Sequence, residues 1–180
     1  MAKYEKLDEL KKRAAKMKPD LDLGLRLLDW RLSFTSDLDD NDLIELINLG
    51  HSLCGIPLRV SRSTIPDSGF GLFVTEDFSE NERITIYGGV FLLDDIYFMR
   101  GETGHYVVNT KSGAYVDGLM GFRLGELGRW CNTNPGHNNA GLGFFGENGV
   151  YVQATKFISA GSEVFCDYGP SYPQDNLRSI

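Results

Sequence analysis

The apolar positions of the first fifty residues follow a helical spacing. In the first segment they recur every three or four residues: Tyr4, Leu7, Leu10, Ala14 and Met17. This spacing predicts an amphipathic helix that ends at Pro19, because proline has no amide hydrogen to donate. From Leu21 to Trp30 the apolar pattern is mixed and indicates a weaker helix.

A third helix is more clearly marked. Four apolar residues form one face of it: Leu43, Ile44, Leu46 and Ile47. Asp39 or Asp40 is suited to cap the start of this helix, and Gly50 its end. We therefore expect a helical N-terminal extension over residues 1–56, which caps the rest of the chain.

After Pro57 the pattern changes to short apolar runs separated by Gly, Asn and Asp. Eight runs predict strands: Leu58–Val60, Gly71–Val74, Ile84–Tyr87, Tyr106–Asn109, Tyr115–Asp117, Leu142–Phe145, Val150–Ala154 and Val164–Cys166. The Asn148-Gly149 pair between two of these runs favours a hairpin. The sequence thus predicts a mainly β (α+β) domain over residues 57–169 and a short C-terminal segment, 170–180.

The charge balance limits the classes of partner. Eighteen basic and 25 acidic residues give a net charge of −7. This argues against binding nucleic acid through a broad basic surface, and it would suit a basic peptide. Mild acidity that only keeps the protein soluble is the more common explanation of such a composition.

The three cysteines are Cys54, Cys131 and Cys166, with no close pair. The three histidines do not complete a zinc-ligand spacing, so no metal is expected. A reducing intracellular compartment is the simpler expectation for such cysteines. No apolar run reaches membrane-spanning length, and we expect a cytosolic or nuclear location.

Three stretches suggest chemistry when they are taken together. Ser68-Gly69-Phe70-Gly71 places two glycines around a bulky residue just before a predicted strand. Arg129-Trp130-Cys131-Asn132 precedes an irregular loop, and Gly161 to Gly169 contains the run Asp167-Tyr168-Gly169. Alone, the first stretch is more often a tight turn than a ligand loop, and the other two would be ordinary loop and strand segments.

In this order, the stretches resemble the SET-domain protein lysine methyltransferases. Arg129-Trp130-Cys131-Asn132 is similar to that family's Arg-Phe-Ile-Asn, and Ala114 to Gly118 is similar to the strand before it. The resemblance covers Pro57 to Gly169. It implies a SET fold of small curled β-sheets, in which the segment around Asn132 passes beneath a C-terminal loop in a pseudoknot-like threading.

The resemblance also implies S-adenosyl-L-methionine as the methyl donor. Donor-binding positions carried over residue by residue are Gly69, Phe70, Gly71, Tyr106, Arg129, Trp130, Asn132 and Thr133. Tyr168 would be the catalytic tyrosine, with Tyr87 beside it. The substrate-binding positions would be Tyr87, Cys166, Tyr168 and Tyr172.

The chain departs from the family pattern in three places. Thr133 stands where the family has a histidine, and no cysteine-rich zinc segment follows Tyr168, so Tyr172 is the expected lid. Cys166 replaces a larger aromatic residue two positions before the catalytic tyrosine. Its small size leaves room for a lysine that already carries methyl groups and favours di- or trimethylation, although an ordinary buried thiol is the alternative.

Two functions from different classes follow. The first is a protein lysine N-methyltransferase acting on a histone tail or a similar basic peptide. The second is a catalytically weak SET-fold module that binds a peptide or partner, which Thr133 and the missing zinc segment would suit. Tyr168 and Asn132 favour the enzyme, because a binding module has no chemical need for either.

Overall fold

The computed structural model describes residues 40–92, 106–118 and 125–169. The chain divides into two compact units, residues 1–59 and 60–180. The first two expected helices and Tyr172 lie outside the described residues. No helix within those described ranges is both long enough and apolar enough to span a bilayer.

The described helix of the first unit, α3, runs from Asp40 to Leu53. Its expected apolar face is largely buried, with Ile44, Leu46 and Ile47 inside. The expected end at Gly50 is wrong. The helix continues through His51, whose ring donates from Nδ1 to the Ile47 carbonyl at 2.8 Å, and the left-handed glycine after the helix is Gly55, with φ 70°.

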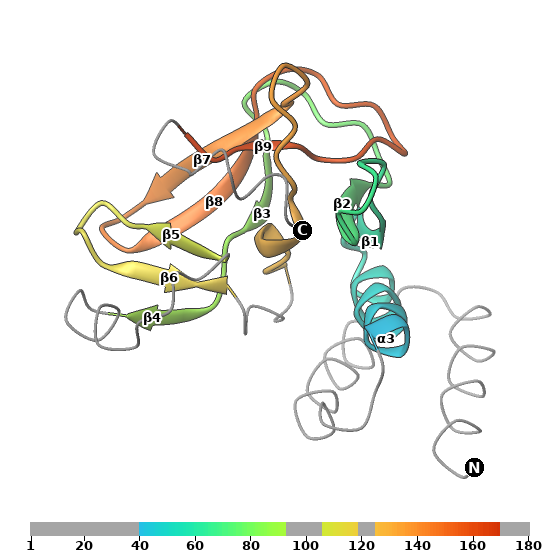
Figure 1. The fold of residues 1–180 in the computed structure, drawn as a ribbon, viewed down its shortest axis with the longest axis horizontal. Helices are drawn as coiled ribbons and strands as arrows, with labels where there is room; N and C mark the ends of the chain where they lie inside the picture. The colour runs from blue at the N-terminus through green and yellow to red at the C-terminus, as the bar shows by residue number, and fades with distance from the viewer. Residues whose placement is uncertain (1–39, 93–105, 119–124, 170–180) are drawn as a thin grey trace, which may run out of the picture. The chain divides into compact units, whose positions relative to one another are not determined.

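The second unit is built from short strands (Figure 1). The strand β1 (Leu58–Arg62) begins in the last two residues of the first unit and pairs with β2 (Phe70–Val74) in a two-stranded sheet. A four-stranded sheet has the order β3-β8-β7-β9, from Arg83–Ile86, Gly149–Ala154, Ala140–Phe145 and Cys166–Asp167. A three-stranded antiparallel sheet has the order β4-β6-β5, from Val90–Leu92, Tyr115–Asp117 and Val107–Asn109. A 3-10 helix, η3, spans Gly128–Trp130.

The expected hairpin is present between β7 and β8, but its turn differs from the expected one. The two strands pair from Ala140 opposite Ala154 to Phe145 opposite Gly149. Gly149 therefore belongs to β8, and the loop holds Gly146 at φ 58°. The left-handed residue of this loop is a glycine, because it has no Cβ to clash in that conformation.

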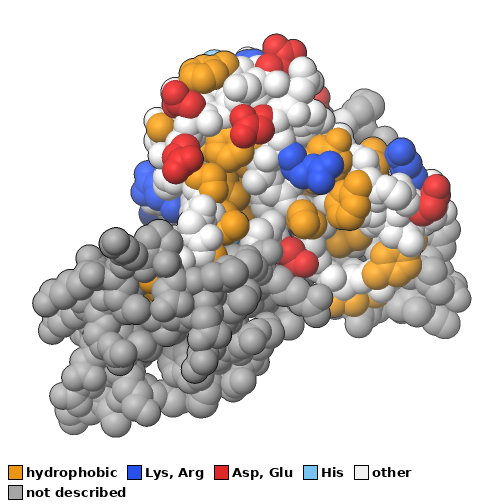
Figure 2. All heavy atoms as spheres, turned by 180° about the vertical axis from the view of Figure 1, so that it is seen from behind, with side chains coloured by type: hydrophobic (Ala, Val, Ile, Leu, Met, Phe, Trp, Pro, Cys, Tyr) orange, Lys and Arg blue, Asp and Glu red, His pale blue; other side chains and the backbone are white. Residues whose placement is uncertain are grey.

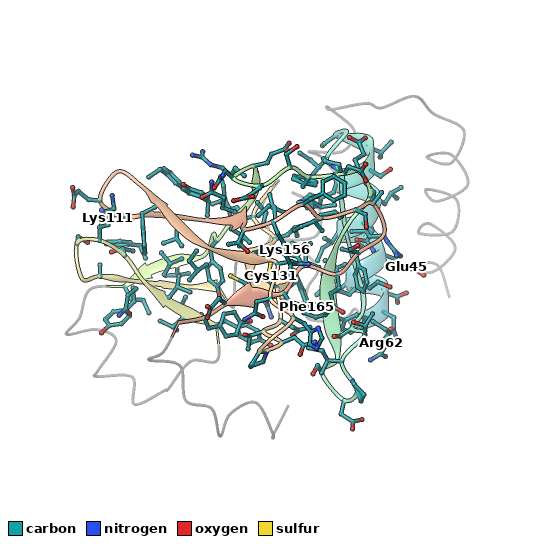
Figure 3. All side chains as sticks on the ribbon, turned by 90° about the horizontal axis from the view of Figure 1, so that it is seen from above. Glu45, Arg62, Lys111, Cys131, Lys156 and Phe165 are labelled. Carbon is teal, nitrogen blue, oxygen red and sulfur yellow. The ribbon has the colours of Figure 1, made fainter. Side chains whose placement is uncertain are left out.

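The C-terminal segment pairs in turn with three parts of the unit. Glu163 bridges Phe73, Phe165 bridges Asn132 in a parallel sense, and Cys166 begins β9, which runs parallel to β7. Because the partner changes at nearly every step, the expected strand Val164–Cys166 is reduced to β9, Cys166–Asp167. This bridge draws residues 132 and 165 together; Figure 3 labels Phe165 and Cys131, the residue before Asn132.

The core of the second unit is mostly aliphatic, with a few buried aromatic rings. Leu72, Val74, Val152 and Val164 have no solvent exposure, and Tyr87 packs in a cluster with Val116 and Val150. The architecture is mainly β with a helix towards the N-terminus, and the expected fold class is confirmed.

Several large apolar side chains of the described residues are exposed: Ile86, Val90, Phe91, Phe144, Phe145 and Phe157. Figure 2 shows a face on which hydrophobic side chains alternate with acidic and basic ones. The guanidinium of Arg83 lies over two aromatic rings, 4.2 Å from the Tyr151 ring centroid and 5.7 Å from that of Phe145.

Candidate active site

Asn132 lies two residues after the end of η3, where two chain segments meet. Its carbonyl accepts a hydrogen bond from the Cys166 amide at 2.8 Å. Its side-chain nitrogen Nδ2 lies 3.1 Å from each of three acceptors: the Ser63 hydroxyl, the Phe70 carbonyl and Oε1 of Glu163. Asn132 therefore joins the loop after β1, the start of β2 and the C-terminal segment.

Glu163, which accepts a hydrogen bond from Asn132, has a buried side chain and is only 4 % exposed. Its Oε2 accepts from both the amide and the hydroxyl of Thr64, at 2.6 Å each, and its Oε1 accepts from the Ser63 hydroxyl at 2.8 Å. Buried carboxylates are stable only when such donors replace water. With the Asn132 amide, Glu163 receives four donors from three residues.

The two glycines of the first motif serve different purposes. Gly69 adopts φ 63°, and a Cβ there would meet nothing within 4 Å. A Cβ on Gly71 would lie 2.0 Å from Oε1 of Glu163 and 3.2 Å from Nδ2 of Asn132. Gly69 is therefore required by the backbone conformation, and Gly71 by the close approach of the Glu163 carboxylate.

Aromatic side chains surround this loop. The Phe70 ring meets the edge of Trp130 at 6.2 Å between centroids and lies 4.5 Å from the Arg62 guanidinium. Arg129 places its guanidinium 4.4 Å from the Tyr106 ring and 4.6 Å from the Trp130 ring. The expected donor-binding positions 70, 106, 129 and 130 thus form one chain of ring contacts.

Tyr87 lies in the same region, and its hydroxyl bonds to a backbone carbonyl. Its hydroxyl donates to the Tyr106 carbonyl at 3.0 Å, and only 6 % of the residue is exposed. Burial raises the pKa of the Tyr87 hydroxyl, and the neighbouring Cys131 raises it further. Tyr87 therefore stays protonated at neutral pH and is unsuited to act as a base; its role in substrate binding stays a prediction.

Tyr168 reaches the residue next to Asn132. Its hydroxyl donates a hydrogen bond to the Cys131 carbonyl. The hydroxyl hydrogen is thereby used, so towards another group the phenol oxygen can act only as an acceptor. The resemblance depended most on Asn132 and Tyr168. The structure brings the Tyr168 hydroxyl to the residue directly before Asn132.

Two buried thiols belong to residues near Asn132 and Tyr168 in the chain, Cys131 and Cys166. Cys131 and Cys166 have at most 1 % exposure. Burial raises the pKa of the Cys166 thiol to about 12, and Asp167 adds to the shift. Burial also raises the pKa of the Cys131 thiol, with Cys166 and Glu163 as further causes. Cys166 thus resembles the buried thiol that the sequence left as an alternative; its effect on the number of methyl groups stays a prediction.

We expect these two thiols to be unreactive in the folded protein, because the thiolate is the reactive form and burial disfavours it. Cys54 is partly exposed. At pH 8, a thiol-reactive disulfide such as DTNB should therefore modify Cys54 first and the other two cysteines only on unfolding. Cys54→Ser should remove the fast phase, and fast modification of two or more thiols in that variant would contradict this expectation.

Sequence reasoning missed Glu163, Ser63 and Thr64. A signal for Glu163 was available, since an acidic residue stands next to apolar positions in the Gly161–Gly169 stretch. Ser63 and Thr64 had none, because they look like ordinary turn residues. Thr133, another expected donor-binding residue, follows Asn132 in an irregular loop closed by Asn134 and Asn138, whose Oδ1 accepts from the Asn134 amide at 2.8 Å.

Within residues 40–92, 106–118 and 125–169, no group of three or more His, Cys, Asp or Glu side chains is arranged to hold a metal ion. The indole N–H of Trp130 is buried and has no hydrogen-bond partner among the described residues. Aromatic rings and hydrogen-bonding groups gather around Asn132 and Trp130.

The fold and this constellation define the class of protein. The family model of the SET domain matches residues 69–169, more than half of the chain, and the chain belongs to the SET-domain family. No curated protein sequence matches it.

Solved structures of Polycomb Repressive Complex 2 have a similar fold. One, ctPRC2 in an autoinhibited conformation bound to S-adenosylmethionine, has a TM-score of 0.54 and 24 % identity, and covers 72 % of this chain. A humanized mutant of the Chaetomium thermophilum complex bound to an inhibitor has a TM-score of 0.54 and 26 % identity over 65 % of the chain. The matches span only 17 % and 15 % of those longer chains.

Proposed function

We propose that this protein is an S-adenosyl-L-methionine-dependent protein lysine N-methyltransferase. One observation carries the proposal. Tyr168 donates to the carbonyl of Cys131, and the next residue, Asn132, donates to the Phe70 carbonyl. Membership of the SET-domain family and a fold similar to a complex bound to S-adenosylmethionine support it.

The residues present fit such a donor. The donor supplies an electrophilic methyl group on a positively charged sulfur, with an ammonium and a carboxylate at one end and an adenine at the other. The Phe70, Tyr106 and Trp130 rings offer faces and edges suited to a cation and a flat base. The Trp130 indole N–H, buried without a partner among described residues, would be satisfied by a ligand acceptor.

Methyl transfer needs a neutral lysine amine. At pH 7 only about one free lysine in a few thousand is neutral, because its pKa is about 10.4. Exclusion of water by a channel lined by Tyr87 and Tyr168 would lower that pKa, as would a nearby positive charge. The chain then needs no dedicated base: the amine nitrogen forms a bond to the methyl carbon, the carbon–sulfur bond breaks, and the excess proton leaves to water.

Tyr168 is proposed to align the reacting groups. Its phenol oxygen, with its hydrogen directed to the Cys131 carbonyl, accepts weak C–H···O contacts from a polarised methyl group. Alignment of this kind is worth several kcal/mol, as an order of magnitude.

The proposed substrate is a lysine on a basic peptide, and the specific candidate is a histone tail. The net charge of −7 supports this choice, since an acidic surface raises the encounter rate of a cationic peptide. The similar solved structures are of Polycomb Repressive Complex 2, and we extend the proposal to a chromatin substrate and a nuclear location.

The test is methyl transfer in vitro. The protein is incubated with donor labelled in the methyl group and with core histones, and the products are analysed by mass spectrometry for lysine methylation. Donor binding is measured separately by calorimetry. We expect binding and transfer to a histone lysine. Donor binding with no transfer to any histone would favour the SET-fold binding module instead, and absence of both would overturn the proposal.

A further inference from the structure

We propose that Glu163 is a positioning residue that fixes the side-chain amide of Asn132, so that the amide oxygen Oδ1 faces the ammonium group of the methyl donor. The inference rests on the proposed function and adds a residue to it. It also names the part of the donor that this corner of the site recognises.

The first step concerns which end of the amide faces inward. The Phe70 carbonyl and the Glu163 carboxylate can only accept hydrogen bonds. The Ser63 hydroxyl donates its hydrogen to Oε1 of Glu163, so it too can only accept from Asn132. All three neighbours of Nδ2 are acceptors, so the NH₂ end of the amide, which carries two hydrogens, faces them and the carbonyl end does not.

The second step concerns the other end. With Nδ2 held inward, Oδ1 must point away from Glu163, and no described residue donates a hydrogen bond to it. An amide oxygen is a pure acceptor, so its ligand must be a donor group. Of the polar groups at the amino-acid end of the donor, the ammonium donates and the carboxylate does not.

The third step concerns charge. None of the described Lys or Arg side chains forms an ion pair with Glu163, which is held by hydroxyl and amide donors alone. A buried carboxylate balanced by neutral dipoles leaves a negative potential nearby, which polarises the Asn132 amide and strengthens Oδ1 as an acceptor. This potential favours a cation over an anion at Oδ1.

The fourth step concerns the motif itself. The Gly71 Cβ position lies 2.0 Å from Oε1 of Glu163, so the carboxylate packs directly against the backbone of the Phe70 loop. The space left by the missing side chain of Gly71 is therefore occupied by the carboxylate of Glu163. Glu163 consequently fixes both Asn132 and this loop.

The test compares two ligands that differ at the amino-acid end. S-adenosylhomocysteine carries the ammonium and carboxylate, whereas 5′-methylthioadenosine has the same adenosine and thioether without them. Binding of each is measured by calorimetry to the wild type and to Glu163→Gln, which keeps the size of the side chain but loses the charge. We expect Glu163→Gln to weaken S-adenosylhomocysteine about tenfold and to leave 5′-methylthioadenosine within about twofold.

Two further variants complete the test. Glu82→Gln makes the same change at an exposed glutamate that accepts from the Ser79 amide, and it should alter neither affinity. Asn132→Ala should weaken S-adenosylhomocysteine, and adding Glu163→Gln should then have little further effect, because residues that act through one another are not additive.

The outcomes separate the two claims. Equal weakening of both ligands by Glu163→Gln, or no weakening of either, would overturn the positioning role while leaving the proposed function intact. A wild type that binds neither ligand would overturn both. If Glu163→Gln does not fold by circular dichroism, Ser63→Ala, which removes one acceptor of Nδ2, is measured in its place and should show the same selectivity with a smaller change.

Discussion

Replacing Tyr168 by phenylalanine should reduce methyl transfer by at least about 100-fold while leaving donor affinity nearly unchanged. The substitution keeps the ring and removes the hydroxyl that donates to the Cys131 carbonyl. Both the anchor of the ring and the oxygen that would face the reacting methyl group are then lost. The measurement is the initial rate of transfer to a histone substrate, with donor binding followed by calorimetry.

Tyr151 provides a matched control. Its ring, on β8, packs against Phe145 of β7 and the guanidinium of Arg83 of β3. Tyr151→Phe should therefore leave the transfer rate within about twofold of the wild type. Equal rates for Tyr168→Phe and the wild type would remove Tyr168 from the proposed mechanism.

Gly71→Ala should be the most destabilising small substitution in the site. The new Cβ would lie 2.0 Å from Oε1 of Glu163, so either the loop or the carboxylate must move. Overpacking together with a disturbed buried carboxylate should lower the free energy of unfolding by about 3 kcal/mol. Thermal unfolding followed by circular dichroism should show a midpoint lower by roughly 10 °C, with donor binding lost.

The neighbouring glycine separates crowding from backbone conformation. Gly69→Ala meets no atom within 4 Å but places a Cβ on a residue with φ 63°. It should cost only about 1 kcal/mol, the usual penalty of the left-handed conformation. Equal destabilisation by the two variants would show that the Glu163 carboxylate does not restrict position 71.

The β architecture was predictable because alternating and short apolar runs mark strands wherever one face is buried. β2, β3 and β8 fall within one residue of the predicted ranges. β4, Val90–Leu92, was not predicted, since a three-residue run with two exposed positions carries too little pattern. Gly50 looked like a helix end, but a glycine is tolerated inside a helix when packing continues beyond it, as the buried Leu53 indicates.

The site was predictable where the chemistry sits in unusual residue types. Tyr168 and Asn132 stood out through the resemblance, and in the structure the Tyr168 hydroxyl bonds to the carbonyl of Cys131, the residue before Asn132. Ser63 and Thr64 could not be found, because a serine and a threonine in a turn are common and their partner lies about a hundred positions away. Only the threading of the C-terminal segment makes that pairing, and no local pattern encodes it.

The successive pairing of residues 163–168 has a consequence for how the protein is made. During translation, β1, β2 and the segment around Asn132 are synthesised before Glu163 and Tyr168. Until then Asn132 lacks its carboxylate partner, and the Cys131 carbonyl lacks the phenol. Domains generally fold as units during synthesis. A nascent chain that stops before Glu163 therefore forms neither the Asn132–Glu163 hydrogen bond nor the Tyr168–Cys131 hydrogen bond.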